Sequence, residues 1–531
     1  MLGKIIDKAF SGCSFRHVDT GPLGPQFREG RLFIPPELLE RAALEGFGDL
    51  GFYFRESHLK LLAARLDDSA SSANDKFVIS TLLKNAAIAA RGELALCQDT
   101  GTAIVYAWKD ESVYTGVDDV SLLEKGIARA YKKNHFRSSQ VGASSFFDEY
   151  DTGNNLPAQV EIKSTCDVDP AGPRYRFLFA AKGGGSSNKT GLFPMTKSLL
   201  EEKNFSAFLE EKINALGTAA CPPYRLAVVV GGSSPEFNLE VLKLATTEIL
   251  DGAPFFGEEH PEGNRIFRDR YWEERAMEMG RRSGLGAQFG GNDLLLDVRV
   301  LRLPRHAASC PVSIGVSCAA HRNMLAFIDR GGLHLESLVR SLREVVPGTF
   351  SDARGIAPGI APGIDLDRPM DDIRRDLAAL PPGTAVLLSG KLLVARDAAH
   401  LKWHELLAAG ENLPGYLYHH PVYYAGPAAT PPGKIIGSLG PTTAQRMDPY
   451  ADELMRRGVT LVTLAKGNRS AAWKEACTKY GGFYLGTIGG AAALLAEEHV
   501  TSSELIDYPE LGMEAVRLIT VRDLPAFIAA G

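Results

Sequence analysis

The sequence predicts an α/β protein of two domains, from three observations. From about residue 104 to 330, short β-rich runs alternate with helical stretches, which is typical of a large α/β domain. At 354–366 an IAPG unit occurs twice, and proline and glycine at this density sustain neither a helix nor a central strand. Beyond this break a shorter alternation of strands and helices resumes. We therefore expect an N-terminal domain at 1–350, a linker at 351–366 and a C-terminal domain at 367–531.

The N-terminal domain is expected to begin with helices. Residues 38–66 and 76–91 carry apolar side chains at helical spacing. Asn74 and Asp75 offer caps to the second helix, and Gly92 ends it. The alternating region then contains β-rich runs at 104–108, 175–179, 226–230 and 298–303 and helical stretches at 236–250 and 266–280.

The C-terminal domain repeats this alternation on a smaller scale. A β-rich run at 384–389 precedes a helix that begins at about residue 396. A second run at 459–465 precedes a helix for which Asn468 is the expected cap, and a glycine-rich turn follows at 489–490. These elements suffice for a compact second α/β unit.

The composition is that of an ordinary globular protein. Hydrophobic residues make up 45% and charged residues 23% of the 531 positions. The 58 lysines and arginines and 64 aspartates and glutamates give a net charge of −6 and an isoelectric point near 6.1. A chain of this sign has no global positive field to gather nucleic acid or a membrane surface. An anionic ligand must therefore be met by local positive charge.

The cysteines and the apolar runs indicate a reducing compartment. No apolar run approaches the roughly 18 residues that span a bilayer, and the first residues lack the apolar region of a secretory signal. The seven cysteines are scattered and include no C-x-x-C pair, so neither a disulfide framework nor a zinc finger is expected. We expect a cytoplasmic protein whose cysteines meet, if at all, only after folding.

Two segments of the N-terminal domain combine glycines with polar side chains. CQDTGTA (97–103) places a thiol beside a carboxamide and a carboxylate and turns at Gly101, although an Asx-type turn with Cys97 as packing filler explains it equally well. KGGGSSNKT (182–190) allows a backbone to approach an anion, or is a plain flexible turn. It has neither the phosphate-loop nor the dinucleotide-binding spacing.

The remaining cysteines of interest lie near prolines or in a β-rich region. Cys221 precedes two prolines, which predicts an extended conformation suited to a metal ligand or to a buried loop cysteine. His306, Cys310 and Cys318 lie close together in sequence, and their spacing does not say which cysteine faces a cofactor.

Three cations of the C-terminal domain lie at predicted element boundaries. They are Arg396 in RDAAH, Arg446 in GPTTAQR and Lys466 in LAKGNRS. They converge only if these boundaries meet at one edge of the sheet, where open α/β folds bind ligands. Taken singly, each is more often a solvated surface charge.

Together these strings carry a family resemblance, because CQDTGTA, AKGGGS, ACPPY, GAQFGG, LPRH, GVSC, RDAAH, GPTTAQRMD, LAKGNRS and GGFYLGTIGG occur in this order. The chain resembles class I fumarate hydratases, the iron–sulfur fumarases, from about residue 38 to 528. The resemblance implies an N-terminal α/β domain that holds a 4Fe-4S cluster and a C-terminal swivelling β/β/α domain. It also implies a homodimer with the active site between the domains.

The resemblance assigns roles to individual residues. It implies Cys97, Cys221 and Cys318 as ligands of a cluster with one iron open to water or substrate, and it excludes Cys310. The implied substrate contacts are Gln98, Asp99, Arg137, His306, Arg396, Thr442, Arg446 and Lys466.

Within this set, Asp99 is the expected proton donor to the departing hydroxyl and Thr442 the expected base. A threonine hydroxyl needs nearby cations to lower its pKa. His306 either relays or orients a proton, or donates a hydrogen bond on the cluster side.

The expected activity is reversible hydration of the dicarboxylate fumarate to (S)-malate. A related dehydratase acting on L-tartrate or mesaconate is the alternative within the same class. A cluster protein that senses iron or oxygen would need no clamp of four cations, and a nucleotide-binding regulator would need a phosphate-loop spacing that is absent.

Overall fold

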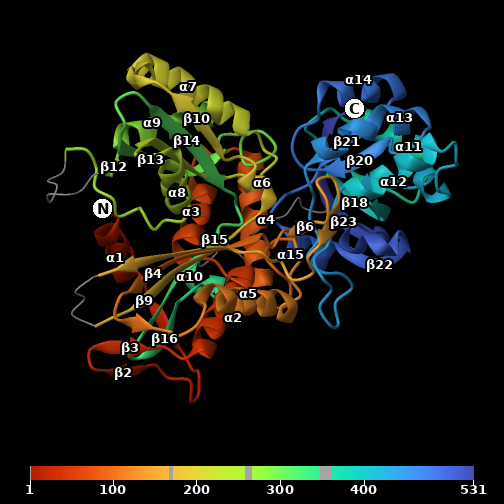
Figure 1. Ribbon diagram of the computed structural model, residues 1–531. Helices are drawn as coiled ribbons and strands as arrows, with labels where there is room; N and C mark the ends of the chain where they lie inside the picture. Colours follow the sequence, from red (N-terminus) through yellow and green to blue (C-terminus); the bar gives the residue numbers. More distant parts are fainter. Residues whose placement is uncertain (1, 167–171, 258–265, 347–360) are drawn as a thin grey trace.

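The computed structural model describes residues 2–166, 172–257, 266–346 and 361–531. They form a mixed α/β structure in two units, one up to residue 346 and one from residue 361 onward, which lie side by side in Figure 1. The predicted mixed α/β class is thus confirmed. Within the described part, no helix combines the length and apolar character needed to cross a bilayer.

One six-stranded sheet runs through the N-terminal unit in the order β1-β16-β15-β9-β4-β8, antiparallel except between β4 and β8. Its strands are β1 (Phe15–Val18), β16 (Gly332–Glu336), β15 (Arg322–Asp329), β9 (Tyr175–Lys182), β4 (Thr102–Asp110) and β8 (Gln159–Thr165). Because β4 begins directly after Gly101, this sheet fixes the position of the CQDTG turn.

A five-stranded sheet of order β10-β14-β11-β13-β12 completes the N-terminal unit. Its strands are β10 (Gly191–Met195), β14 (Cys310–Ser317), β11 (Tyr224–Gly232), β13 (Leu295–Arg305) and β12 (Phe267–Arg268). β11 and β14 are antiparallel, with Arg225 opposite Ser317. Cys221, just before β11, and Cys318, just after β14, are therefore brought to the same edge of this sheet.

The N-terminal unit also has two smaller sheets. One contains β2 (Gln26–Arg28), β3 (Arg31–Phe33) and β5 (Val113–Tyr114), and the other contains β6 (Val141–Ala143) and β7 (Glu149–Asp151).

Helices cover these sheets in layers. The apolar faces of α2 and α5 pack on one face of the six-stranded sheet, α1 and α8 pack between the two sheets, and α7 and α9 pack on the five-stranded sheet. The helices of this unit are α1 (Gly3–Ser11), α2 (Pro36–Phe52), α3 (Glu56–Asp67), α4 (Ala73–Ala89), α5 (Asp119–Lys133), α6 (Gly184–Ser187), α7 (Glu202–Leu216), α8 (Pro235–Ala245), α9 (Arg270–Arg282) and α10 (Leu342–Val345).

The C-terminal unit is built on a seven-stranded sheet of order β17-β18-β19-β20-β21-β23-β22. β17 to β21 are parallel, and β23 pairs antiparallel with both β18 and β21, which closes these strands into a ring. The strands are β17 (Gly363–Asp365), β18 (Ala385–Val394), β19 (Val422–Tyr423), β20 (Val462–Ala465), β21 (Phe483–Gly486), β22 (Val500–Asp507) and β23 (Val516–Ala530). The helices are α11 (Met370–Ala378), α12 (Asp397–Ala408), α13 (Ala451–Arg456), α14 (Ala471–Tyr480) and α15 (Ala492–Leu494).

One hydrophobic core joins the two units. Val78 and Leu82 of α4 belong to the same buried cluster as Leu464 of β20 and Leu485 of β21. Figure 1 shows α4 on the side of the N-terminal unit that faces the C-terminal unit. Burial of apolar side chains from both units fixes how they meet, so residues on facing loops can share one cavity.

Several predicted boundaries are wrong in detail. The helix expected at 38–66 is two helices, because the chain between α2 and α3 extends at Phe54 and pairs there with Val339. The cap of α4 is Ser72, which forms a capping box with Asp75, and not Asn74. Similarly, Ser470 caps α14 in place of Asn468.

The expected linker differs from the structure at its end. Residues 351–360 lie outside the described residues, whereas 363–365 form β17 at the edge of the C-terminal sheet. A proline- and glycine-rich segment is excluded from central strands because it lacks donors, but an edge strand tolerates it.

Candidate active site

All predicted substrate contacts except His306 line one cavity of about 610 Å³ between the two units. Gln98, Asp99 and Arg137 come from the N-terminal unit, and Arg396, Thr442, Arg446 and Lys466 come from the C-terminal unit. The C-terminal side follows from the sheet: Arg396 comes after β18 and Lys466 directly after β20, at the carboxyl ends of parallel strands.

The CQDTG turn holds Asp99 in a network of donors. The Asp99 Oδ2 atom accepts a hydrogen bond of 2.9 Å from the Gly184 N–H, and Oδ1 lies 3.5 Å from Arg137 Nη2. The Arg322 guanidinium donates to the Asp99 carbonyl over 2.8 Å. Gly101, with a φ of +87°, turns the chain where a Cβ would lie 2.9 Å from the Lys182 carbonyl carbon. Both glycine-containing motifs thus meet at this carboxylate.

These contacts set the ionisation of Asp99. Burial raises the pKa of its carboxyl, but the guanidinium groups of Arg137 and Arg322 and the Gly184 N–H outweigh burial and hold the pKa below its usual range. Asp99 is therefore a carboxylate at neutral pH. As a carboxylate it can accept a proton but has none to donate.

The two C-terminal arginines are paired with carboxylates that the motifs did not single out as site residues. Arg396 donates to Glu514, and Arg446 donates to Asp397. The Arg396 side chain is only 11% exposed, whereas that of Arg446 is 48% exposed. Glu514 also accepts a 3.1 Å hydrogen bond from the Ala398 N–H. Because both carboxylates line the cavity, they hold the guanidinium groups toward it and offset part of their charge.

Thr442 and Lys466 lie on adjacent segments. The Lys466 N–H donates to the Thr442 carbonyl over 3.1 Å. A buried ion pair farther along ties the same segments together: Arg469 Nε lies 2.7 Å from Asp448 Oδ1, and Asp448 Oδ2 accepts from the Ser470 N–H at 2.6 Å. This ion pair was not predicted from the sequence, because nothing in the AQRMD and GNRS strings indicates that their charged residues contact each other.

Cys97, Cys221 and Cys318 gather beside this cavity. The Cys221 carbonyl accepts a 3.0 Å hydrogen bond from the Ala319 N–H, which places Cys318 next to Cys221. The Lys466 ammonium lies 2.9 Å from Cys221 Sγ. The prediction that Cys221 is extended is wrong: its φ is +60°, because Cys221 closes a turn through an N–H bond to the Thr218 carbonyl. Cys310 lies at the opposite end of β14 from Cys318 and is fully buried.

Burial and mutual charge shift the ionisation of these groups. The pKa of the Cys97 thiol is raised to about 11, mainly by burial. The Asp99 carboxylate and the other two cysteines also raise this pKa, whereas the Arg322 guanidinium lowers it. The pKa of Cys318 is raised by burial and by Cys221. For Lys466, burial lowers the pKa but Cys221 more than compensates, so its pKa is about 12. Lys466 is thus a permanent cation at neutral pH.

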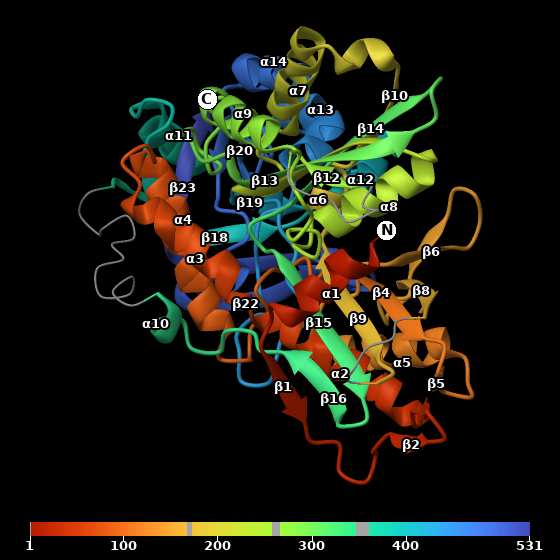
Figure 2. The same cartoon turned by 90° about the vertical axis from the view of Figure 1, so that its left-hand side faces the viewer.

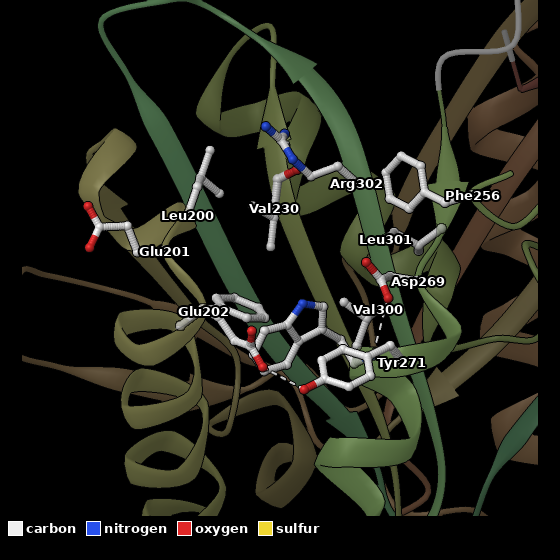
Figure 3. Close-up of a pocket in the computed structure, with 12 residues that line it drawn as sticks. Leu200, Glu201, Glu202, Val230, Phe256, Asp269, Tyr271, Val300, Leu301 and Arg302 are labelled. Carbon is white, nitrogen blue, oxygen red and sulfur yellow. Dashed lines mark hydrogen bonds between the residues drawn. The ribbon is translucent and has the colours of Figure 1, made fainter.

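A second cavity, of about 450 Å³, lies between α7, α9 and β13 (Figure 3). Its lining includes Tyr271, Trp272, the carboxylates Glu201, Glu202 and Asp269, and one arginine. Figure 3 shows Glu202 accepting from the Tyr271 hydroxyl, at 2.6 Å. Three carboxylates against one guanidinium repel a dianion, so we do not assign the substrate to this cavity.

His306 lies outside the cavity of its own chain. It follows β13 in an exposed turn, where its Nδ1 accepts a 3.2 Å hydrogen bond from the Ala308 N–H. The structure therefore does not bring it to Asp99 and Thr442 within one chain.

Family models match nearly the whole chain. The model described as fumarate hydratase (fumerase) matches residues 40–326, and the model described as fumarase C-terminus matches residues 332–531. The first matched region lies within the N-terminal unit, and the second contains β16 and α10 of that unit together with the C-terminal unit.

Similar proteins carry related names. The chain is 46% identical over 502 residues to fumarate hydratase 2 of Leishmania major, covering 94% of this chain and 86% of that protein. It is 48% identical over 497 residues to the anaerobic class I fumarate hydratase of Escherichia coli strain K12, covering 94% and 89%. A putative L(+)-tartrate dehydratase subunit beta of Methanocaldococcus jannaschii is 34% identical over 160 residues, 30% of this chain and 82% of that one. The predicted family is confirmed, and this chain belongs to the class I fumarate hydratases, a family of enzymes.

Proposed function

We propose that this protein catalyses the reversible hydration of fumarate to (S)-malate in the cavity between its two units. The observation that carries the proposal is the convergence of Arg137, Arg396, Arg446 and Lys466 on one cavity. Four cations around one space of a net negative protein favour an anionic ligand, although the carboxylates of Asp99, Glu149, Asp397 and Glu514 line the same cavity. Their arrival from both units fits a ligand with a carboxylate at each end.

We propose further that Cys97, Cys221 and Cys318 hold a 4Fe-4S cluster. Within the described ranges, no three His, Cys, Asp or Glu side chains are close enough to ligate a single metal ion. A cluster takes each thiolate on a different iron, so it suits three thiols that are near one another but too spread for one ion. The charges of Arg322 and Lys466 offset those of the thiolates. When bound, the cluster would supply a Lewis-acidic iron with an open position.

The chain's own cations bind and polarise the substrate. Removing a proton next to a carboxylate places further negative charge on an anionic group, and fixed cations lower that barrier. Arg396 is the most constrained of the C-terminal cations that face the substrate, because it is buried and held by Glu514. Lys466 supports this role as a cation and not as a base, because its pKa is about 12.

Asp99 and Thr442 are the proposed proton-transfer groups. An ionised Asp99 can take a proton from the attacking water during hydration, and by microscopic reversibility it returns that proton to the departing hydroxyl during dehydration. Its lowered pKa supports this assignment in the hydration direction. Thr442 would exchange the carbon-bound proton, with its hydroxyl acidified by Arg446 and Lys466 on the same cavity wall.

We expect a homodimer, and His306 is relevant to it. Because His306 is exposed and lies outside the cavity of its own chain, a direct catalytic role for it requires His306 of the partner subunit. The cytoplasm is the proposed location, since a reducing compartment suits a chain whose scattered cysteines include no C-x-x-C pair.

The proposed reaction is tested by comparing substrates. The full chain would be reconstituted with iron and sulfide without air, and rates would be measured on fumarate, mesaconate and L-tartrate. We expect the highest kcat/KM on fumarate. L-tartrate is the most informative alternative substrate, because part of this chain is similar to a putative L(+)-tartrate dehydratase subunit. A higher kcat/KM on L-tartrate or mesaconate would assign the enzyme to that substrate instead.

Gly489→Ala is expected to lower bound iron and fumarate turnover together. A Cβ at Gly489 would lie 2.3 Å from Cys221 Sγ and 3.0 Å from Lys466 Cδ, so the thiol must move. Gln288 prevents the turn from relaxing, because it bonds both the N–H and the carbonyl of Gly489. Iron per folded chain would be measured beside Gly415→Ala, where a Cβ meets nothing within 4 Å. Equal iron in both variants would argue against Cys221 as a ligand.

A further inference from the structure

The loop that carries Cys318 joins the two main sheets of the N-terminal unit. β14 ends at Ser317 in the five-stranded sheet, and β15 follows in the six-stranded sheet. Residues 318–321 lie between these strands, so neither set of sheet hydrogen bonds holds them directly. The Ala319 N–H donates to the Cys221 carbonyl over 3.0 Å, which ties the middle of the loop to a second proposed cluster ligand.

A histidine from outside the loop holds the residue after Cys318. His58 Nε2 lies 2.9 Å from the Ala319 carbonyl oxygen. Burial holds the pKa of His58 well below its usual value, so the neutral ring has a single N–H. Because a carbonyl oxygen only accepts, that N–H is at Nε2 and donates to Ala319. His58 lies in the first turn of α3, where it is fully buried, and α3 packs beside α4 (Figure 2).

The other ring nitrogen indicates why a histidine stands at this position. His58 Nδ1 is buried and has no hydrogen-bond partner among the described residues. On one side the ring packs edge to face against Phe54, with centroids 5.0 Å apart. A buried nitrogen without a partner costs free energy, so this surrounding does not by itself favour a histidine. The role of His58 therefore lies in its bond to the Cys318 loop.

A second histidine holds the residue before Cys318. His321 Nδ1 lies 2.7 Å from Ser317 Oγ, and His321 Nε2 lies 3.1 Å from Glu248 Oε1. Burial lowers the pKa of His321 to about 4, so this ring is also neutral at neutral pH. Because a carboxylate only accepts, Nε2 carries the proton and Nδ1 accepts from the Ser317 hydroxyl.

Glu248 connects the two histidines. Its carboxylate accepts from the Ser57 hydroxyl over 2.8 Å and lies 3.3 Å from Arg225 Nη1. Ser57 precedes His58 in α3, and the rings of His58 and His321 have centroids 5.3 Å apart. None of the side chains of His58, His321 and Glu248 lines the active-site cavity. Any effect that they have on the reaction therefore passes through the loop.

We propose that His58 and His321 are positioning residues that set the place of the Cys318 thiolate for the cluster. The residues on both sides of Cys318 are each bonded to a buried histidine. Hydrogen bonds from outside a ligand set orient the ligands and raise metal affinity. This role rests on the proposed cluster, but not on which dicarboxylate is the substrate.

His58→Leu tests the Nε2 donor. The full chain would be reconstituted with iron and sulfide without air, and the release of iron to the chelator ferrozine would be followed. Release should be at least about tenfold faster in His58→Leu than in the wild type. In His58→Gln it should stay close to the wild-type rate, because a glutamine Nε2 can donate to the same carbonyl. Equally fast release in both variants would overturn the role of the donor.

His321 is tested through its bond to Ser317. His321→Leu should speed iron release, and Ser317→Ala should do so to a smaller extent. Adding Ser317→Ala to His321→Leu should change the rate little further, since the bond between the two side chains is already lost. Wild-type release in His321→Leu, or full additivity of the two changes, would remove His321 from the proposal.

His400→Leu is the matched control. His400 is 1% exposed, and its Nδ1 bonds the Arg396 carbonyl over 2.8 Å in the C-terminal unit, away from the three cysteines. Both His58→Leu and His400→Leu should lower the Tm of the iron-free chain. Only His58→Leu should release iron faster. Equal acceleration in His400→Leu would mean that a weakened fold releases the iron, and would overturn the positioning role.

A spectrum of the bound cluster separates a displaced ligand from a loosened fold. The electron paramagnetic resonance spectrum of the dithionite-reduced protein should differ from that of the wild type in His58→Leu and match it in His58→Gln, at equal iron content. Unaltered spectra in both His58→Leu and His321→Leu would overturn the inference.

The remaining outcomes separate this inference from the proposed activity. Wild-type release rates in His58→Leu and His321→Leu, in a protein that hydrates fumarate, overturn the positioning role alone. Faster release in both, in a wild type that binds the cluster without hydrating fumarate, supports the positioning role and refutes the activity. A wild type that binds no iron and sulfide overturns both.

Discussion

Arg396→Met is expected to lower kcat/KM on fumarate by about a thousandfold, with a fall in kcat as well as a rise in KM. The guanidinium is buried in the cavity wall, where its attraction to a carboxylate is weakly screened. Its removal also leaves the Glu514 carboxylate facing the dianion without its guanidinium partner. Because charge on the substrate increases in the transition state, the lost cation raises the barrier beyond its effect on binding. Steady-state kinetics on protein of equal iron content would measure both.

Two matched variants locate the cause of this loss. Adding Glu514→Gln to Arg396→Met removes the unpaired carboxylate and should recover part of the affinity. Arg446→Met should cost less than Arg396→Met, since the Arg446 side chain is 48% exposed and more strongly screened. Wild-type kcat/KM in Arg396→Met would show that the cavity between the units does not bind the substrate as proposed.

Asp99→Asn is expected to lower kcat by about a hundredfold or more while leaving KM unchanged or lower. Asparagine keeps the shape of the side chain and can still accept from the Gly184 N–H, but it takes no proton at neutral pH. It also removes a negative charge from a cavity that binds a dianion, so binding should not weaken. The split between kcat and KM would be read from saturation curves in the hydration direction.

Iron content decides how this result is interpreted. Asp99 lies two residues from Cys97, so a variant that has lost iron says nothing about proton transfer. With iron at the wild-type level, an unchanged kcat would remove Asp99 from the reaction. Thr442→Val would then be the next variant, because Thr442 is the other proposed proton-transfer group on the cavity wall.

Long buried strands were predictable from sequence, and their ends were not. The β-rich runs at 104–108, 175–179 and 226–230 fall within β4, β9 and β11, whose side chains are almost all buried, so apolar residues run without interruption. The break between α2 and α3 depends on the pairing of Phe54 with Val339, which no local pattern reports. The cap at Ser72 was not predictable, because the neighbouring polar residues are equally good helix caps when judged from the sequence alone.

Some residues of the candidate active site were also predictable from the sequence, and others were not. Arg396 and Lys466 were recognisable by motif, and the carboxyl ends of parallel strands explain why they meet. Glu514 was not recognisable, because it lies in no motif and reaches Arg396 from 118 positions away. The φ of Cys221 was also outside sequence reasoning, since the turn from Thr218 overrides the preference of a residue before proline.

The iron and sulfide bound per chain in single Cys→Ser variants, purified and reconstituted without air, test the cluster assignment. Cys97, Cys221 and Cys318, from three separate loops, are proposed to hold one cluster beside the cation-lined cavity. Each of these three variants should lose most of its iron and its fumarate hydratase activity. Cys310→Ser, at the far end of β14, should keep wild-type iron and activity. Full iron in Cys221→Ser, or a loss in Cys310→Ser equal to that in the others, would rule out this set of cluster ligands.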